Sequence, residues 1–300
     1  MVYLHVMSLL IDQICNFLNE EGVSCSQYTR NGLELISAFI PSRKSARDIL
    51  PLSVSASDMK EAEAQSGHIR KCIEDMLSDN GEYPLIVTED RWNVQRAMMK
   101  SRILSHLEVF SPIYARNCEV RRIDKAAAKE FLEKYHSYGH AACRYCYGLF
   151  FKRHTGHIAL EESSRPIPTG ELMAVATFSN ARKWVKGDKT IRSYEWTRYA
   201  SLPHVRLSGG MGRLLKAFIK DAQPDDIMSY ADLEWSEGAV YSQLGFGLEG
   251  QKDPVTFEID TSWHRVPIKD TCSSGASNVG RGYFQNLGSN KYRLKLTEYE

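Results

Sequence analysis

A glycine cluster running into an amphipathic segment constrains the fold of this chain more than any other feature. The cluster is Ser208-Gly-Gly-Met-Gly212, and apolar residues then recur at helical spacing from Leu214 to Ile219. Three glycines within four residues leave backbone N–H groups uncovered by side chains. A helix N-terminus with bare amides attracts a phosphate or pyrophosphate, so the pattern predicts a turn–helix unit that is either an anion site or a plain helix cap.

The residues after this cluster complete a larger pattern. A strand-like segment covers 227–233, and the ending Tyr241-Ser-Gln-Leu-Gly-Phe246 follows it. Together with the turn, these segments resemble the GNAT acyltransferases over about residues 119–260. The resemblance implies an α/β (α+β) fold with a mixed central sheet flanked by helices, preceded by a smaller N-terminal α/β domain.

The same resemblance implies a cofactor, acetyl-CoA or another acyl-CoA. In GNAT enzymes the glycine turn holds the pyrophosphate, which assigns that role to Gly209, Gly210 and Gly212. Arg206 and Arg213 flank the turn as candidate phosphate contacts. The family pattern would place a basic or amide residue one position after Arg206, where this chain has leucine. We therefore expect the backbone of the turn, more than these side chains, to contact the phosphates.

Acyl transfer needs an acid for the leaving thiolate and a base for the acceptor amine. Tyr241 occupies the acid position of the resembled family, and a core tyrosine is the alternative. Glu195 is the first candidate base, or it pairs with a neighbouring arginine. Asp232 is a second candidate base, and Tyr230 on the same strand face would shape the acceptor pocket. Alternation places Glu195, Thr197 and Tyr199 on one strand face and Tyr194, Trp196 and Arg198 on the other.

Four residues with metal-binding side chains lie close together in the sequence: His136, His140, Cys143 and Cys146. Their spacing admits a structural zinc. Alternation along a strand that begins near Cys146 would point the two thiols to opposite faces, and the resembled family has a histidine at this turn without cysteines. We therefore expect no metal, and interpret His136 as a catalytic or substrate-facing residue.

Three segments of the N-terminal half and its boundary form another pattern. They are Leu85-Ile-Val-Thr-Glu-Asp-Arg-Trp92, Lys100-Ser-Arg-Ile103 and Tyr114-Ala-Arg-Asn-Cys-Glu119. They resemble phage-borne homing endonucleases related to the very-short-patch-repair nucleases, many of which continue into a GNAT-like module. A Mg²⁺ nuclease needs carboxylates from neighbouring strands, and only Glu34 and Asp48 fall near suitable places. The resemblance implies a degenerate nuclease module; a generic accessory domain is the alternative.

Basic and aromatic residues interleave at two places. Arg182, Lys183 and Trp184 form the first set, with further basic residues up to Arg192. The second set comprises Arg281, Tyr283, Lys291, Tyr292, Arg293 and Lys295. Such mixtures suit a polyanion with exposed bases, which makes the first set a candidate nucleic-acid or substrate contact, although a basic surface loop has the same composition.

Periodicity and breakers divide the chain into two parts, which we predict as domains 1–112 and 113–300. In the first part we expect helices at 8–19, 67–79 and 90–106, strands at 33–40 and 83–88, and loop with at most one short helix at 42–66. In the second part we expect strands at 118–123, 145–152, 170–180 and 192–200, and a helix at 125–135 capped by Asp124.

Bulk properties exclude several classes of protein. A formal charge of +1 does not by itself indicate nucleic-acid binding, and seven scattered cysteines argue against a secreted disulfide framework. The apolar N-terminal residues lack a preceding basic region and are interrupted at Asp12, so we expect no membrane segment and a cytoplasmic protein.

These observations together predict an acyl-CoA-dependent N-acyltransferase. A nucleobase or a nucleic-acid-associated protein is the preferred acceptor, because phage Mom-type adenine modifiers are similar in being GNAT-like enzymes that act on DNA. The alternative is a non-catalytic DNA-binding protein of a phage or mobile element that keeps the GNAT fold as a scaffold. A small-molecule N-acyltransferase is a third hypothesis. The sequence does not indicate an oligomeric state.

Overall fold

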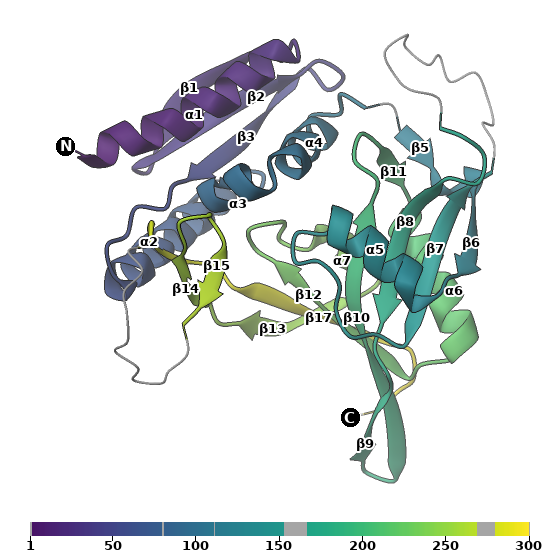
Figure 1. The fold of residues 1–300 in the computed structure, drawn as a ribbon. Helices are drawn as coiled ribbons and strands as arrows, with labels where there is room; N and C mark the ends of the chain where they lie inside the picture. The colour runs from purple at the N-terminus through teal and green to yellow at the C-terminus, as the bar shows by residue number, and fades with distance from the viewer. Residues whose placement is uncertain (1, 80, 111, 153–166, 269–279, 300) are drawn as a thin grey trace. The chain divides into compact units, whose positions relative to one another are not determined.

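The computed structural model describes residues 2–79, 81–110, 112–152, 167–268 and 280–299 (Figure 1). The chain divides into two compact units. Unit 1 comprises Met1–Leu107, Ala231–Ala239 and Gly250–Asn290, and unit 2 comprises Glu108–Tyr230, Val240–Glu249 and Lys291–Glu300. Unit 1 is therefore larger than the predicted N-terminal domain, since it takes in two later segments. The division into domains 1–112 and 113–300 stays a prediction about which parts fold on their own.

Unit 1 is built around a four-stranded sheet in the order β1-β2-β3-β4. Its strands are β1 (Cys25–Arg30), β2 (Leu33–Ile40), β3 (Ser45–Leu52) and β4 (Leu85–Thr88). The first three strands are antiparallel, and β4 runs parallel to β3. Helix α1 (Val2–Glu20) contacts β1, β2 and β3, and α2 (Met59–Ser78) links β3 to β4. Parallel pairing needs such a crossover connection.

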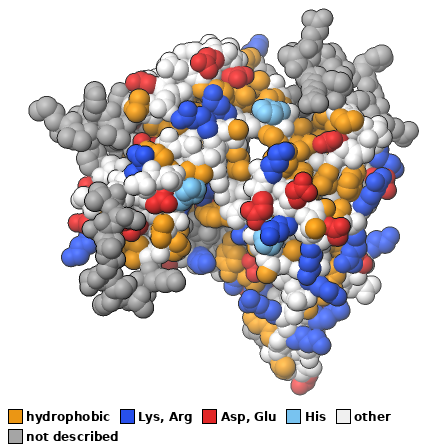
Figure 2. Space-filling view, in the orientation of Figure 1, with side chains coloured by type: hydrophobic (Ala, Val, Ile, Leu, Met, Phe, Trp, Pro, Cys, Tyr) orange, Lys and Arg blue, Asp and Glu red, His pale blue; other side chains and the backbone are white. Residues whose placement is uncertain are grey.

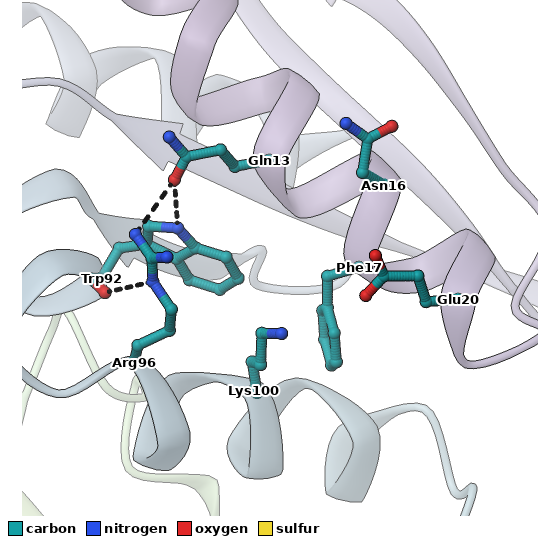
Figure 3. Close-up of a pocket in the computed structure, with 7 residues that line it drawn as sticks. All are labelled: Gln13, Asn16, Phe17, Glu20, Trp92, Arg96 and Lys100. Carbon is teal, nitrogen blue, oxygen red and sulfur yellow. Dashed lines mark hydrogen bonds between the residues drawn. The ribbon is translucent and has the colours of Figure 1, made fainter.

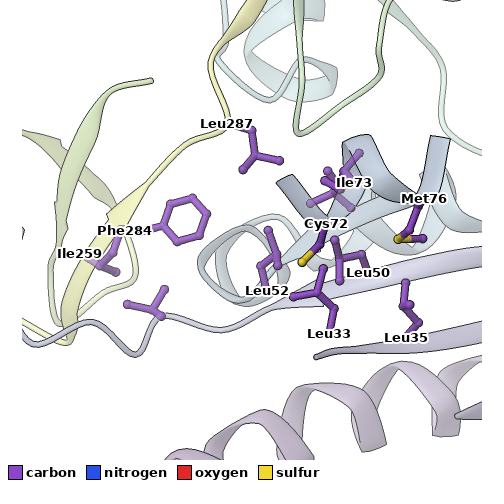
Figure 4. Packing of buried hydrophobic residues seen from close by; sticks show 12 residues of the cluster. Leu33, Leu35, Leu50, Leu52, Cys72, Ile73, Met76, Ile259, Phe284 and Leu287 are labelled. Carbon is purple, nitrogen blue, oxygen red and sulfur yellow. The ribbon is translucent and has the colours of Figure 1, made fainter. Parts of the chain in front are cut away.

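The core of unit 1 joins segments that are distant in sequence (Figure 4). Leu33 and Leu50 of the sheet are buried together with Ile73 of α2. Ile259 and Phe284 belong to the same cluster and come from β14 (Thr256–Ile259) and β16 (Gly282–Gln285), which form a small sheet with β15 (Arg265–Pro267). Each fully buried side chain of this kind contributes about 1.5–3 kcal/mol. This burial explains why the tail belongs to unit 1.

The N-terminal predictions are partly confirmed. The helix at 8–19 and the strands at 33–40 and 83–88 are present as α1, β2 and β4. The loop predicted for 42–66 is wrong, because it contains β3 and the start of α2. Only the second half of β3 is buried, so its polar first half resembles a loop in sequence. The helix predicted at 90–106 is broken at Gln95 into α3 (Glu89–Val94) and α4 (Arg96–His106).

Unit 2 contains most of an eight-stranded mixed sheet in the order β13-β17-β12-β10-β8-β7-β6, with β9 paired to β10. Its strands are β6 (Cys118–Arg122), β7 (Tyr145–Phe151), β8 (Leu172–Phe178), β9 (Arg182–Lys186), β10 (Lys189–Ser201), β12 (Asp226–Asp232), β13 (Gly247–Lys252) and β17 (Ser289–Lys295). Strands β6, β7, β8 and β10 are antiparallel, whereas β10 and β12 are parallel. The predicted mixed α/β class, with a mixed central sheet flanked by helices, is confirmed.

Helices cover both faces of this sheet (Figure 1). Helix α5 (Lys125–Tyr135) packs Phe131 and Leu132 against β7, β8 and β10, and Asp124 caps it by accepting a 2.7 Å hydrogen bond from Ala127 N. Helix α6 (Gly210–Ala222) packs on the other face, where the rings of Phe218 and Phe178 stack at 3.8 Å. Among the described residues no helix has the length and apolar character needed to span a membrane.

Candidate functional site

The glycine turn forms the junction between β11 (Arg206–Ser208) and α6. Gly209 is the N-cap of α6 and adopts the left-handed region with φ 77°. A Cβ on Gly210 would lie 2.8 Å from Leu207 Cδ2 and 2.9 Å from the Tyr199 hydroxyl. The backbone conformation therefore favours glycine at 209, and close side-chain packing favours glycine at 210. The N–H groups of the first turn of α6 have no helical partner, as at every helix start, and can bind an anion.

The two arginines beside the turn differ in their partners. Arg206 forms an ion pair with Glu108, with 2.5 Å between Nη2 and Oε1, so its charge is already balanced. Arg213 is exposed on the first turn of α6 and has no carboxylate partner in the described part of the chain. Of the two candidate phosphate contacts, the geometry favours Arg213.

Tyr241 lies on the short helix α7 (Ala239–Gln243) with its hydroxyl directed to β12. Its Oη is 2.8 Å from Ser229 Oγ, which is 3.0 Å from the Trp196 carbonyl oxygen. The Trp196 and Tyr292 rings contact its ring, at centroid distances of 6.1 and 5.3 Å. Burial raises the pKa of Tyr241, and the hydrogen bond with Ser229 acts in the opposite direction. Tyr241 is therefore held in place by an aromatic cluster, and its role as an acid stays a prediction.

The parallel strands β10 and β12 pair over only three residues. The register joins Ser193 to Asp226 and ends at Glu195 and Met228. Beyond this point the Ser229 side chain, rather than a backbone N–H, donates to the β10 carbonyl at Trp196. The strands therefore separate at the level of Tyr241. Backbone groups in such a separation can bind an extended ligand as an added strand would.

A β-bulge in β10 overturns the predicted alternation of its side chains. The pairing with β8 shifts between Trp196 and Arg198. The Tyr199 ring consequently lies 6.3 Å from the Trp196 ring, on the face that carries α6, whereas Arg198 interacts electrostatically with Glu195. The prediction that Tyr199 shares a face with Glu195, and Arg198 with Trp196, is wrong because a bulge inserts one extra residue.

Glu195 and Arg198 form the second half of the site. The Glu195 carboxylate is partly exposed and has no hydrogen bond or ion pair within the described residues, while its backbone N–H and C=O are both held by Ser179. Arg198 donates to the carbonyl oxygens of Gly139 and Thr197, at 3.2 and 2.8 Å. Burial lowers the pKa of Arg198, and Glu195 acts in the opposite direction. The predicted pairing of Glu195 with an arginine is thus an electrostatic contact without a salt bridge.

The turn that follows α5 lies beside these residues. His136 ends α5, and its Nδ1 accepts a 3.1 Å hydrogen bond from Tyr138 N. Gly139, with φ 61°, closes the turn and presents its carbonyl to Arg198. The structure thus brings His136 to the Arg198 side of β10, and its predicted catalytic role stays a prediction.

The four candidate zinc ligands do not gather around one point. His140 Nδ1 lies 3.2 Å from Glu133, and the Cys143 and Cys146 sulfurs lie 3.5 Å apart. Cys143 precedes β7, so strand alternation does not apply to it and the expected opposite orientation of the thiols is wrong. In the described part of the chain, no group of three or more His, Cys, Asp or Glu is placed to hold a metal.

Asp232 lies at the end of β12 within a cluster of charges in unit 1. Its Oδ2 is 3.3 Å from Arg91 Nη2, and its Oδ1 accepts a 2.9 Å hydrogen bond from Glu234 N. Both carboxylate oxygens of Asp232 are therefore engaged by partners within unit 1. The geometry therefore favours Glu195 over Asp232 as the base. Tyr230, on the same strand, is 38 % exposed.

The two predicted basic and aromatic sets have different environments. Arg182, Lys183 and Trp184 lie exposed on β9. In the second set, Lys291 and Arg293 both pair with Glu249, at 2.7 and 2.6 Å. Lys291 and Arg293 are therefore engaged within the fold, whereas the first set offers an open basic surface.

The nuclease-type carboxylates are not assembled into a metal site in the described residues. Asp48 faces Ser37 across the β2–β3 ladder, whereas Glu34 faces Thr29 of β1. Burial and a hydrogen bond with Asp48 raise the pKa of Tyr28 to about 12. Asp48 thus has a structural partner, and the nuclease origin of this module stays a prediction.

A pocket of about 170 Å³ lies between α1 and the helices α3 and α4 (Figure 3). Gln13 Oε1 accepts hydrogen bonds from Trp92 Nε1 at 2.8 Å and from Arg96 Nη2 at 3.3 Å. Lys100 Nζ lies 4.5 Å from the centre of the Phe17 ring. The polar side chains named here bind one another or a neighbouring ring. We therefore interpret the pocket as a packing gap where the helices meet, not as a ligand site.

Three residues that contact the predicted site residues were not candidates in the sequence analysis: Ser229, Arg198 and Tyr199. Ser229 and Tyr199 belong to no recognisable motif, and their positions depend on the separation of β10 from β12 and on the bulge. The presence of an arginine next to a candidate base was the one usable signal for Arg198.

Several solved structures are similar to this chain. Eis1 from Mycobacterium abscessus is 17% identical, with a TM-score of 0.32 over 47% of this chain and 34% of that one. A conserved protein of unknown function from Enterococcus faecalis V583, described as a probable N-acyltransferase, is 12% identical, with a TM-score of 0.33 over 47% of this chain and 35% of that one. An acetyltransferase (GNAT family) from Bacillus anthracis is 12% identical, with a TM-score of 0.30 over 62% of this chain and 97% of that one.

The chain thus spans about a third of the length of the first two of these proteins. No family model matches the chain, and no curated protein sequence matches it. With TM-scores between 0.30 and 0.33, these likenesses do not establish a function for this chain.

Proposed function

We propose that this protein is an acyl-CoA-dependent N-acyltransferase of the GNAT type. The observation that carries the proposal is the separation of β10 from β12 after Glu195, with the glycine-rich start of α6 and the Tyr241 hydroxyl both next to it. Leu244 links the two, because its Cδ2 would lie 3.1 Å from a Cβ on Gly212. One elongated ligand could therefore contact a phosphate-binding turn at one end and a proton donor at the other.

The residues fit acyl-CoA in three ways. The N–H groups at the start of α6, with Arg213 beside them, would hold the pyrophosphate. The unpaired edges of β10 and β12 would take the amide-containing arm. When bound, acyl-CoA would supply an activated thioester, and Tyr241 would lie at its sulfur. Arg206, engaged with Glu108, would act as support for the turn.

Proton transfer would divide between two residues. Glu195, whose carboxylate has no partner in the described residues, would accept a proton from the acceptor amine. Tyr241 would donate to the departing thiolate. Ser229 has a single hydroxyl proton and two neighbouring acceptors, the Trp196 carbonyl and Tyr241 Oη. When Ser229 donates to Tyr241, the phenol proton is free to leave.

A nucleobase amine, or an amine of a nucleic-acid-associated protein, is the acceptor we propose. The exposed basic and aromatic residues on β9 support it, because they suit a polyanion with stackable bases. The same residues favour a second candidate function, a DNA-binding protein that keeps this fold without catalysis. A small-molecule N-acyltransferase would need no such surface.

Release of free coenzyme A thiol from acetyl-CoA, measured with nucleic acid, basic peptide or small amines as acceptors, tests the function. The proposal expects acceptor-dependent thiol release that Tyr241→Phe lowers by about 10²–10⁴-fold. If none of these acceptors causes thiol release and the protein binds nucleic acid tightly, the non-catalytic DNA-binding function would be favoured.

A further inference from the structure

The β9–β10 hairpin concentrates positive charge. Residues 182–192 contain five basic residues and one acidic residue, Asp188. Among the described strands, β9 pairs with β10 alone, and the hairpin projects beyond the end of the main sheet (Figure 1). Figure 2 shows Lys and Arg side chains gathered over this part of unit 2. The near-neutral net charge of the whole chain conceals this local excess.

The register of the hairpin places like charges opposite one another. Lys183 pairs with Arg192. Directly opposed like charges destabilise a two-stranded ladder. Arg192 is partly balanced by Asp225 at 3.5 Å, but Lys183 has no carboxylate partner in the described chain. The fold alone gives no reason for this arrangement, whereas an anionic partner would relieve the repulsion.

Trp184 adds a fixed aromatic surface to the same hairpin. The guanidinium carbon of Arg293 lies 5.2 Å from the centre of its ring. Arg293 is itself buried, with Nη1 2.8 Å from Asp226 and Nε 2.6 Å from Glu249. The indole is therefore positioned by a residue that cannot move freely, yet its side chain remains 42 % exposed. An aromatic ring held in this way loses little entropy when a ligand stacks on it.

We propose that the β9–β10 hairpin binds single-stranded nucleic acid. Trp184 stacks on a base, and Arg182 and Lys183 contact phosphates. Positively charged grooves with aromatic platforms are the means by which proteins bind single strands without sequence preference. Under the proposed function this element would bring the acceptor to unit 2, but the inference does not depend on acyl transfer and is tested separately from it.

The arrangement of apolar residues argues against a lipid surface as the partner. Val185 is 75 % exposed, but it follows Trp184 directly on the strand. Successive strand residues point to opposite faces, so the two side chains cannot enter a bilayer together from one face. Cations occur on both faces as well, since Arg182 alternates with Lys183. A flexible strand that wraps the hairpin uses both faces, whereas a flat surface uses one.

Fluorescence anisotropy with a short fluorescein-labelled DNA of mixed sequence tests the inference. The single strand should bind, with an affinity that falls as salt rises. Trp184→Ala should weaken binding about 5- to 150-fold, and Trp184→Phe should retain most of the affinity. Lys183→Gln should reduce the slope of log affinity against log salt by about 0.7, whereas Lys129→Gln, an exposed change on α5, should leave the slope unchanged.

Several outcomes would overturn the inference. The first is that the protein binds neither the DNA strand nor an RNA of the same sequence. The second is that wild type and Trp184→Ala bind the strand with equal affinity. The third is that duplex DNA binds more tightly than the single strand and that its affinity does not depend on Trp184. Binding to phosphatidylserine vesicles but not to nucleic acid would replace it with a membrane role. A thermal unfolding midpoint of Trp184→Ala equal to that of wild type would show that the variant is folded. An acetyl-CoA titration of wild type tests the proposed function separately, so the two failures can be told apart.

Discussion

The hydroxyl oxygens of Ser229 and Tyr241 lie 2.8 Å apart, at the point where two parallel strands of the central sheet separate. The Ser229 hydroxyl also lies 3.0 Å from the Trp196 carbonyl oxygen, so a side chain takes the place of the backbone bond that would continue the ladder. The contact therefore links the strand separation to the orientation of the phenol. The same contact fixes Tyr241, the proposed acid, to strand β12, because the short helix α7 alone would hold it weakly.

Removing the Ser229 hydroxyl should affect both stability and rate. Ser229→Ala leaves the buried Tyr241 oxygen without its partner, which costs about 1–3 kcal/mol in the free energy of unfolding. The rate of acyl transfer should fall because the phenol is no longer oriented, while the Kd for acetyl-CoA changes little. Ser242→Ala, an exposed serine on α7, is the matched control and should leave both quantities unchanged. A Ser229→Ala variant with the wild-type rate would contradict the claim that Ser229 orients the Tyr241 phenol for catalysis.

Glu195→Gln should separate catalysis from binding. An amide cannot accept the proton of the acceptor amine, so kcat should fall about 10²–10⁴-fold. Acetyl-CoA affinity should be retained, because the carboxylate is not assigned to the coenzyme. Glu130→Gln, an exposed change on α5, provides the comparison. Full activity of Glu195→Gln would return Asp232 or His136 to consideration as the base.

Glu249 should make the stability of unit 2 depend on acidic pH. Hydrogen bonds from Arg293 and Lys291 lower its pKa to about 2, against 4.5 for the ordinary group. Because the folded pKa is depressed, the stabilisation is complete above about 4.5 and is lost as pH falls toward about 2. The Tm difference between wild type and Glu249→Gln should shrink over that window. If this Tm difference stayed constant over that pH range, Glu249 would stabilise the fold through packing and not through its charge.

Arg265 should be essential to the stability of unit 1. Its Nε lies 2.6 Å from Asp90, its Nη1 lies 2.9 Å from Glu234, and both carboxylates are almost fully buried. Burial alone would raise the pKa of Asp90, but Arg265 outweighs it and the pKa is lowered. Arg265→Met removes the guanidinium from the buried Asp90 and leaves Glu234 with Arg91 as its remaining partner, so it should cost about 3–5 kcal/mol in denaturant unfolding.

The matched change for Arg265 is Arg281→Met. Arg281 is exposed and contacts Trp263, with 4.2 Å from guanidinium carbon to ring centre, so its loss should cost about 0.5–1 kcal/mol. Equal costs for the two substitutions would contradict the role given to the buried pair.

The elements with strong periodicity were predictable from sequence, and those defined by pairing were not. The helix after Gly210 and the cap at Asp124 follow from local rules and are confirmed. Strand β3 was missed because its first half is polar, and such a strand is specified by its neighbours rather than by its own pattern. The attachment of the tail to unit 1 depends on Phe284 packing with residues far away in sequence, which no local pattern encodes.

The candidate site shows the same division. The glycine turn and Tyr241 were identified by residue type and spacing. The partners that decide their roles, Ser229 for Tyr241 and Glu108 for Arg206, come from other strands and loops. The sheet face on which the Arg198 side chain lies could not be inferred. It depends on a β-bulge, and the amino-acid sequence around the bulge gives no sign of it.

Calorimetric titration with acetyl-CoA tests the central claim most directly, using wild type, Arg213→Glu and Lys220→Glu. Both variants place the same charge change on exposed positions of α6, one at its N-terminal turn and one at its last turn. A carboxylate at the N-terminal turn favours the helix, so Arg213→Glu should fold normally. We expect wild type and Lys220→Glu to bind with similar Kd, and Arg213→Glu to bind at least about tenfold more weakly. No binding to wild type, or equal binding to all three proteins, would contradict a pyrophosphate site at the glycine turn.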